Sequence, residues 1–233
     1  MSMDHVCERP PTMKAARAVD LSEARREGTY PLERALAQRR SLREFSAAAL
    51  HCDELAQLAW AAQGVVTRDG LRTSPSAGAL FPLELYIGAG NVADVPSGMY
   101  GYEPSSHRLV PIAAGDRRRD IANAAWDQHW LAQAPAIIVV AAVEQRTIDK
   151  YGKRGVRYVY MEAGHAAQNV LLQATALGLG GTVVGAFSDA EVKFAAALSD
   201  NAQPLYLIPV GRPREPRPSL YAGPEQAPHG ARY

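Results

Sequence analysis

Three arginines and a serine stand close together in the stretch RRSLREF, residues 39–45. Guanidinium groups bind a phosphate through paired hydrogen bonds, and a serine hydroxyl adds a further short one. Ser41 and Glu44 also have the spacing of a capping box, which marks a helix start, and a helix N-terminus itself favours anions. The stretch therefore predicts a helix start with solvated arginines, a phosphate site, or both at once.

A second stretch, RTSPSAGALFP at residues 72–82, consists largely of small side chains. Ser74 and Ser76 lack the glycine-flanked setting of a hydrolytic nucleophile, which disfavours a catalytic pairing with His107 or His129. Small residues instead let backbone and hydroxyl groups touch a planar ligand directly. We therefore expect a loop that lies against such a ligand.

The glycines of GLGG, residues 178–181, invite comparison with a dinucleotide-binding loop. That fingerprint needs a strand before the glycines and a helix after them, and here the expected order is reversed. Gly178 is therefore interpreted as a helix C-cap, and the glycines after it as positions where the backbone approaches another group closely.

Glu162 and His165 have the Glu-x-x-His spacing found in di-iron bundles. The chain offers no second pair of this kind, so we expect no metal site. Glu162, His165, Gln168 and Asn169 are instead predicted to make buried hydrogen bonds that tie one helix to its surroundings. The two cysteines, Cys7 and Cys52, lack a Cys-x-x-Cys partner and are predicted to be free thiols.

Composition limits the class of protein. The chain has 25 basic and 24 acidic residues, and this balance argues against nucleic acid as a partner. No uncharged apolar run reaches the roughly 18 residues of a membrane span, and the first residues lack a secretory pattern. We expect a soluble, cytoplasmic protein.

The elements that must position these residues follow from the periodicity. Residues 1–29 are predicted to form an N-terminal arm, residues 30–213 one domain, and the proline-rich residues 214–233 an extended tail. Helices are expected over 31–40, 53–63, 157–177 and 189–200, with helical turns over 117–134. Strands are expected over 83–90, 99–102, 108–112, 135–143, 182–187 and 205–211.

The grouping of these elements indicates the fold class. Strands do not alternate regularly with helices, which favours an α+β structure over a doubly wound one. The 135–143 segment is apolar throughout and reads as a central strand. The 157–177 helix has apolar or small residues nearly all round, so it is expected to lie inside the domain or at a subunit interface.

In order along the chain, four segments resemble the nitroreductase superfamily of flavin enzymes. They are RRSLREF, RTSPSAGALFPLELY, KYGKRGVRYVYMEAGHAAQNVLLQATALGLGGTVVGAF and LYLIPVGRP. The motifs PSAGAL and KYGxRGxRYxxxEAGH are most similar to its SagB-type branch, the thiazoline and oxazoline dehydrogenases and their stand-alone relatives. The resemblance implies a mostly antiparallel sheet flanked by helices, a long buried central helix, bound FMN, and a homodimer with the flavin at the subunit interface.

Carried over by motif position, the resemblance also implies site residues. Those expected to contact the FMN phosphate and ribityl chain are Arg39, Ser41, Arg43 and Arg212, with Arg40 matching less clearly. Those expected along the isoalloxazine ring are Pro75, Ser76 and Gly78 on one side and Val184, Gly185 and Ala186 on the other. These positions would hold the cofactor that carries the redox chemistry.

Lys150 and Tyr151 match the Lys-Tyr pair associated with catalysis in azoline dehydrogenases. A lysine there would take a proton from an azoline carbon while hydride passes to FMN, provided that burial or Arg154 and Arg157 lower its pKa. The alternative is that both residues lie in a solvated loop. The function implied is an FMN-dependent dehydrogenase of a small or peptide substrate; the alternatives are an NAD(P)H-dependent reductase of nitro compounds or quinones, and a flavin-binding module without turnover.

Overall fold

The structure, a computed structural model, describes residues 17–126 and 128–215. Its described residues form a seven-stranded sheet in the order β1-β4-β3-β2-β5-β7-β6, and every neighbouring pair is antiparallel. The strands are β1 (Val19–Asp20), β2 (Leu83–Ala89), β3 (Gly98–Glu103), β4 (Arg108–Ala114), β5 (Ala136–Ala142), β6 (Gly180–Gly181) and β7 (Gln203–Gly211). The α+β fold class predicted from the sequence is confirmed.

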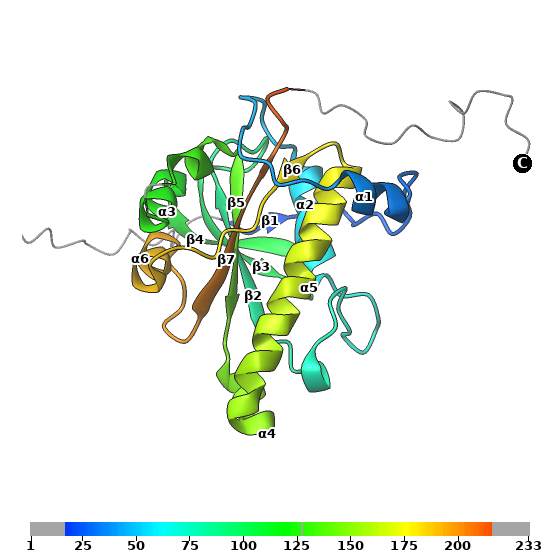
Figure 1. Ribbon diagram of the computed structural model, residues 1–233, viewed down its shortest axis with the longest axis vertical. Coiled ribbons are helices and arrows are strands. Elements are labelled where there is room, and N and C mark those ends of the chain that lie inside the picture. Colours follow the sequence, from blue (N-terminus) through cyan, green and yellow to red (C-terminus); the bar gives the residue numbers. More distant parts are fainter. Residues whose placement is uncertain (1–16, 127, 216–233) are drawn as a thin grey trace, which may run out of the picture.

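Helices cover both faces of this sheet (Figure 1). They are α1 (Leu32–Gln38), α2 (Cys52–Gln63), α3 (Arg118–Ala124), α4 (Gln145–Tyr151), α5 (Gly155–Ala176) and α6 (Asp189–Ala195). Three short 3-10 turns complete the set: η1 (Ala77–Ala79), η2 (His129–Gln133) and η3 (Gly152–Arg154). Figure 1 shows α5 as a long yellow-green helix that crosses one side of the sheet, with α3 and α6 on the opposite side.

Strand β5 lies at the centre of two hydrophobic cores. All its residues are fully buried, and it pairs with β2 on one side and β7 on the other. Because side chains alternate along a strand, Ile138 packs into the core beneath α2 and α5, and Ile137 packs into the core beneath α3 and α6. This confirms the central strand predicted for residues 135–143.

The predicted helix start at Ser41 is wrong. Residues 41–46 are not helical, and backbone groups among them pair across the fold instead: Leu42 N–H donates to the Gly181 carbonyl at 3.0 Å. The capping contact lies further on, where the Glu54 carboxylate accepts a hydrogen bond of 2.9 Å from the His51 N–H at the start of α2. An isolated Ser-x-x-Glu spacing could not show that tertiary pairing would take up these backbone groups.

Two further elements differ from expectation. Residues 182–187 do not form a strand, because only Val184 pairs with Leu207 while Gly185 and Ala186 are exposed. Helix α4 was not predicted, since it has almost no apolar face and buries only Thr147. Lys150 and Tyr151 lie in its last turn rather than in a loop.

Helix α5 buries one face and leaves the other in solvent. Val159, Ala163 and Val170 lie in the core, whereas Tyr160 and Met161 are 53% and 48% exposed. Glu162 is buried and Asn169 half-buried, but His165 and Gln168 are exposed, so the predicted burial of those two residues is wrong. The period of the helix turns these positions away from the sheet.

The described part of the N-terminal arm packs on the domain. β1 pairs with β4, and the Arg25 backbone exchanges hydrogen bonds of 2.8 and 2.9 Å with the Gln57 side chain. Cys52 is a free, half-buried thiol; Cys7 and almost all of the predicted tail lie outside the described residues. None of the helices in the described part of the chain could span a membrane.

Candidate functional site

The arginine segment, residues 39–43, runs along the surface after α1 and pairs with β6 through Ser41 and Gly181. Arg40 is exposed and folds back onto the carbonyls of Ala37 and Arg39, at 2.9 and 2.8 Å. Arg43 is also exposed, with its guanidinium carbon 5.8 Å from the centre of the Trp130 ring. Within the described residues neither Arg39 nor Arg43 is ion-paired, so both cations remain available to an anion.

Arg212, in contrast, has a partner within the protein. Its guanidinium nitrogens contact the two Glu54 carboxylate oxygens at 2.7 and 3.2 Å and donate to the Ala49 carbonyl at 3.0 Å. Glu54 is largely buried, so this pair ties the end of β7 to the start of α2. A phosphate contact from Arg212 stays a prediction. It would use the Nε–H or the second Nη2 hydrogen, which these three hydrogen bonds leave free.

The serine–glycine loop, residues 75–81, has an unusual backbone. Gly78, Ala79 and Phe81 adopt φ angles of 63°, 53° and 46°, a left-handed conformation that side chains disfavour. The Phe81 N–H donates to the Ser76 hydroxyl oxygen at 2.9 Å and closes the loop. Pro75, Gly78 and Ala79 are exposed. Clustered strain of this kind is typical of sites that hold a ligand.

Lys150 and Tyr151 lie directly against Gly78. A β-carbon placed on Gly78 would come within 2.8 Å of both the Lys150 ammonium nitrogen and the Tyr151 hydroxyl oxygen. The Lys150 nitrogen is 5.6 Å from the centre of the Tyr151 ring, and the edge of Tyr158 packs on that ring with centroids 5.2 Å apart. The fold thus joins two predicted groups, the loop and the Lys-Tyr pair, that are about 70 residues apart in sequence.

A buried polar cluster supports the same loop from beneath. Burial raises the pKa of Glu162 to about 7, although a hydrogen bond from Ser76 and the charge of Arg72 oppose this shift. Arg72 donates to the side-chain amide oxygen of Gln63 at 2.7 Å, and its guanidinium carbon lies 4.6 Å from the centre of the Phe81 ring. Sequence reasoning missed Arg72, although it opens the stretch that contains the loop.

Residues 184–186 follow β6, which carries the pairing of Gly181 with Ser41, and lead away from that pairing alongside β7. Val184 is buried and paired with β7, whereas Gly185 and Ala186 expose their backbone. Gln128 donates to the Ala186 carbonyl at 3.1 Å, and Trp130 in the same short segment meets Arg43. Ala186 is therefore linked to the surroundings of Arg43 through the segment that holds Gln128 and Trp130.

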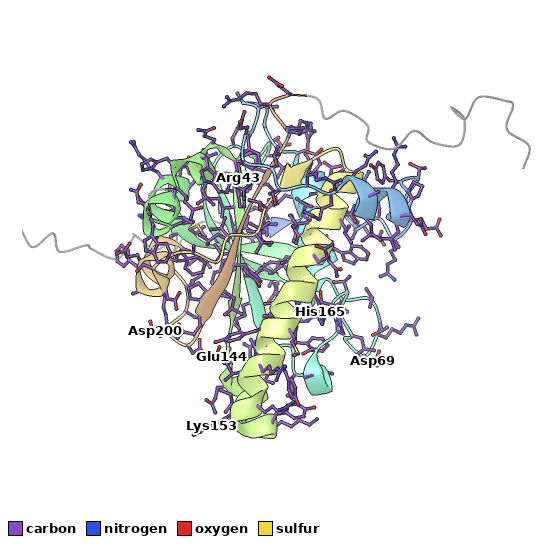
Figure 2. All side chains as sticks on the ribbon, viewed as in Figure 1. Arg43, Asp69, Glu144, Lys153, His165 and Asp200 are labelled. Carbon is purple, nitrogen blue, oxygen red and sulfur yellow. The ribbon has the colours of Figure 1, made fainter. Side chains whose placement is uncertain are left out.

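The predicted residues fall into two groups at opposite ends of α5. Lys150 and Tyr151 precede its first turn, while the arginine segment pairs with Gly181 just beyond its last turn. A helix of 22 residues is about 33 Å long. Figure 2 shows Arg43 in the upper half of the molecule and Lys153 at its lower end. One small ligand bound to a single chain therefore cannot touch both Arg43 and Lys150.

The described residues contain no cluster of three or more His, Cys, Asp or Glu side chains suited to a metal ion. The available groups are instead unpaired guanidinium cations, exposed backbone and a Lys-Tyr pair. Such groups can bind an anionic, planar ligand and hold or move a proton.

Comparison with known proteins gives a consistent result. A family description, "Nitroreductase family", matches residues 36–212. A Methanocaldococcus jannaschii protein is 45% identical over 181 residues, which are 78% of this chain and 90% of that protein. A crystal structure from Ralstonia eutropha has a TM-score of 0.76 and 29% identity over 88% of this chain and 93% of that one. Both proteins are described as "putative nitroreductase".

A third similarity is partial. The microcin B17-processing protein McbC of Escherichia coli is 30% identical over 128 residues, which are 52% of this chain and 46% of that protein. Less than half of McbC is therefore matched. This relative bears on the choice between branches of the family, not on the fold.

Proposed function

The chain belongs to the nitroreductase family of oxidoreductases, which use FMN, and on that premise we propose that it binds FMN and moves hydride between the flavin and a small or peptide substrate. The observation that carries the proposal is the contact of Lys150 and Tyr151 with Gly78, which unites two motifs of the SagB-type branch. The partial similarity to McbC supports the same branch.

The arginine segment fits the phosphate end of FMN. Arg39 and Arg43 have no carboxylate partner in the described chain, and Ser41 exposes its hydroxyl beside them. A phosphate carries close to two negative charges at neutral pH, and two guanidinium groups would balance them. Arg40 already donates to backbone carbonyls, which agrees with its weaker match to the motif.

The serine–glycine loop and residues 184–186 fit the ring of FMN. Both offer exposed backbone without large side chains, so a flat ring can approach N–H and carbonyl groups closely. Ala186 is linked through Gln128 and Trp130 to Arg43, whereas Gly78 lies at the far end of α5. A single chain would therefore supply the phosphate contacts and one side of the ring. A second copy would supply its serine–glycine loop for the other side. The proposal therefore includes a homodimer.

When bound, FMN supplies the acceptor or donor of hydride. Residues of the chain accept or donate the proton that the substrate loses or gains. The Lys150 nitrogen and the Tyr151 oxygen both lie over the Gly78 α-carbon, where either atom can hold or accept a proton at a substrate carbon next to the loop. In the dehydrogenase direction this pair would take the proton that the substrate carbon loses.

A reductase that uses NAD(P)H to reduce nitro compounds or quinones is the second candidate, favoured by the description of the 45% identical relative. The third is a flavin-binding module without turnover. Mixing the purified protein with an azoline peptide and oxygen separates these cases. A loss of two hydrogens from the peptide, seen by mass spectrometry, indicates the dehydrogenase. In a separate assay, bleaching of the flavin by NAD(P)H and its restoration by a quinone indicate the reductase. If neither change occurs, the protein is a flavin-binding module.

FMN binding itself is the first test. We expect a yellow protein that releases FMN on denaturation. Replacing both Arg39 and Arg43 with Ala should weaken FMN binding by at least about 100-fold, since hydrogen bonds to charged groups contribute roughly 1.5–3 kcal/mol each. Arg119→Ala, which removes an exposed arginine from α3, is the matched control. A protein that stays colourless with added FMN contradicts the function, and unchanged affinity in the double variant contradicts only the phosphate assignment.

A further inference from the structure

Glu162 occupies an unusual position under the serine–glycine loop. It lies on the buried side of α5, is only 3% exposed, and its Oε1 atom has no hydrogen-bond partner among the described residues. Buried carboxyl oxygens are normally paired, because removing them from water without a partner is unfavourable. An unpartnered oxygen at the base of a strained loop calls for a functional explanation.

The Ser76 hydroxyl links this carboxyl group to the loop. Ser76 donates a hydrogen bond toward Glu162, and its oxygen accepts the Phe81 N–H at 2.9 Å. A hydroxyl group has only one hydrogen to donate. While that hydrogen points at Glu162, Ser76 cannot donate it to a group bound against the exposed side of the loop.

The charges around Glu162 come from several elements. Arg72, which precedes the loop, is the charged group that acts on it directly. Arg72 is in turn influenced by Arg146 of α4, Glu84 of β2 and Tyr102 of β3, and Lys150 lies against the loop at Gly78. Burial outweighs the attraction of Arg72 and keeps the carboxyl group within reach of protonation near neutral pH.

We propose that Glu162 is a positioning residue, and that its protonation decides whether the Ser76 hydroxyl hydrogen is held inside the protein or offered to the bound ring. An ionised carboxylate is a strong acceptor and retains the hydrogen. A neutral carboxyl group is a weaker acceptor and releases it to an acceptor atom of the ligand. The change consists of one proton taken from water, and no covalent bond between heavy atoms is altered. The inference rests on the proposed function, in which Ser76 lines the flavin.

The test measures dissociation constants of flavin by fluorescence quenching from about pH 5.5 to about pH 8.5, a range that brackets the pKa of about 7. Wild type, Glu162→Gln and Ser76→Ala are compared. Because the FMN phosphate itself titrates near pH 6, each variant is compared with wild type at every pH, and riboflavin, which has no phosphate, is the second probe. Glu191→Gln, which removes an exposed carboxylate from α6, is the control.

We expect wild type to bind flavin about three- to tenfold more tightly at the low end of this range than at the high end, the size of one hydrogen bond. Glu162→Gln should bind tightly at both ends, because its amide is never charged. Ser76→Ala should bind weakly at both ends, and Glu191→Gln should follow wild type.

Parallel pH curves for wild type, Glu162→Gln and Ser76→Ala would overturn the inference and leave the proposed function intact. If Glu162→Gln does not fold, the comparison of Ser76→Ala with wild type is sufficient: the same dependence of the dissociation constant on pH in both proteins overturns the inference. Absence of flavin binding in wild type at every pH refutes the proposed function, and with it the inference that depends on it.

Discussion

The buried carboxyl group of Glu162 also affects folding in the absence of any ligand. Its pKa is about 7 in the folded chain, against about 4.3 for an exposed glutamate. A carboxyl group with a raised folded-state pKa contributes stability that is fully present below its unfolded pKa and is lost as the pH rises through its folded pKa. Glu162 therefore favours the folded state most at acidic pH.

This linkage predicts a pH-dependent difference between wild type and Glu162→Gln. Relative to the variant, wild type should lose about 3 kcal/mol of unfolding free energy between about pH 4.5 and about pH 8, since each pKa unit corresponds to about 1.4 kcal/mol. Urea unfolding of FMN-free protein at several pH values measures it. Glu191→Gln is again the control, and a constant difference between wild type and Glu162→Gln would contradict the assignment.

At the scale of elements, the contact between the serine–glycine loop and the end of α4 depends on a missing side chain. Gly78 has a left-handed φ of 63°, and any β-carbon there would displace Lys150 and Tyr151. Gly178 has a similar φ of 72°, but a β-carbon at that position would meet no atom within 4 Å. Replacing either glycine thus carries the same free-energy cost of a left-handed backbone, but only a β-carbon at Gly78 would also meet Lys150 and Tyr151.

Gly78→Ala and Gly178→Ala should each lower the unfolding free energy by about 1–2 kcal/mol, the cost of a left-handed alanine. Only Gly78→Ala should also reduce turnover, by about 10- to 100-fold, because it shifts Lys150 and Tyr151 from the substrate. Thermal unfolding and steady-state kinetics of both variants measure these effects. Equal turnover in the two variants would show that the Lys-Tyr pair is not positioned through Gly78.

Most elements could be predicted from the sequence because their periodicity is strong. The apolar β5, the alternating β2 and the long α5 follow from local pattern. The capping box at Ser41 and the strand over 182–187 were wrong, since in both places a tertiary contact decides the backbone. Helix α4 lacks an apolar face and gave no periodic signal.

The candidate site shows the same division. The arginine segment and the serine–glycine loop were identified by residue type and motif. Their spatial separation within one chain was not predicted from the sequence. Arg72 and Glu162 interact electrostatically although they are 90 residues apart in sequence. That interaction depends on how α5 packs on the sheet. Pairings of this kind are set by the whole fold and leave no local pattern.

For the whole molecule, the exposed side of α5 is the surface that the proposed homodimer would bury. Tyr160 and Met161 are large apolar residues on that side, near the same end as Lys150. Met161→Glu should produce monomers and reduce bound FMN in parallel, because a charge buried at an interface is unfavourable. Light scattering after gel filtration, together with the flavin absorbance, measures both quantities.

Val110→Glu is the matched control for this experiment, since Val110 is a partly exposed apolar residue on β4, outside α5. It should leave both oligomeric state and flavin content unchanged. A monodisperse wild-type monomer that retains FMN would contradict the dimer, and a Met161→Glu dimer with full FMN would place the interface elsewhere.

The length of α5 has a genetic consequence. If each site takes its arginines from one chain and its Lys-Tyr pair from another, two different defects can complement each other. A chain without Arg39 and Arg43 and a chain without Lys150 would each be inactive alone. In a mixed pair both defects fall on one site and the other site is whole, so co-expression of the two chains would restore up to half of the activity per pair.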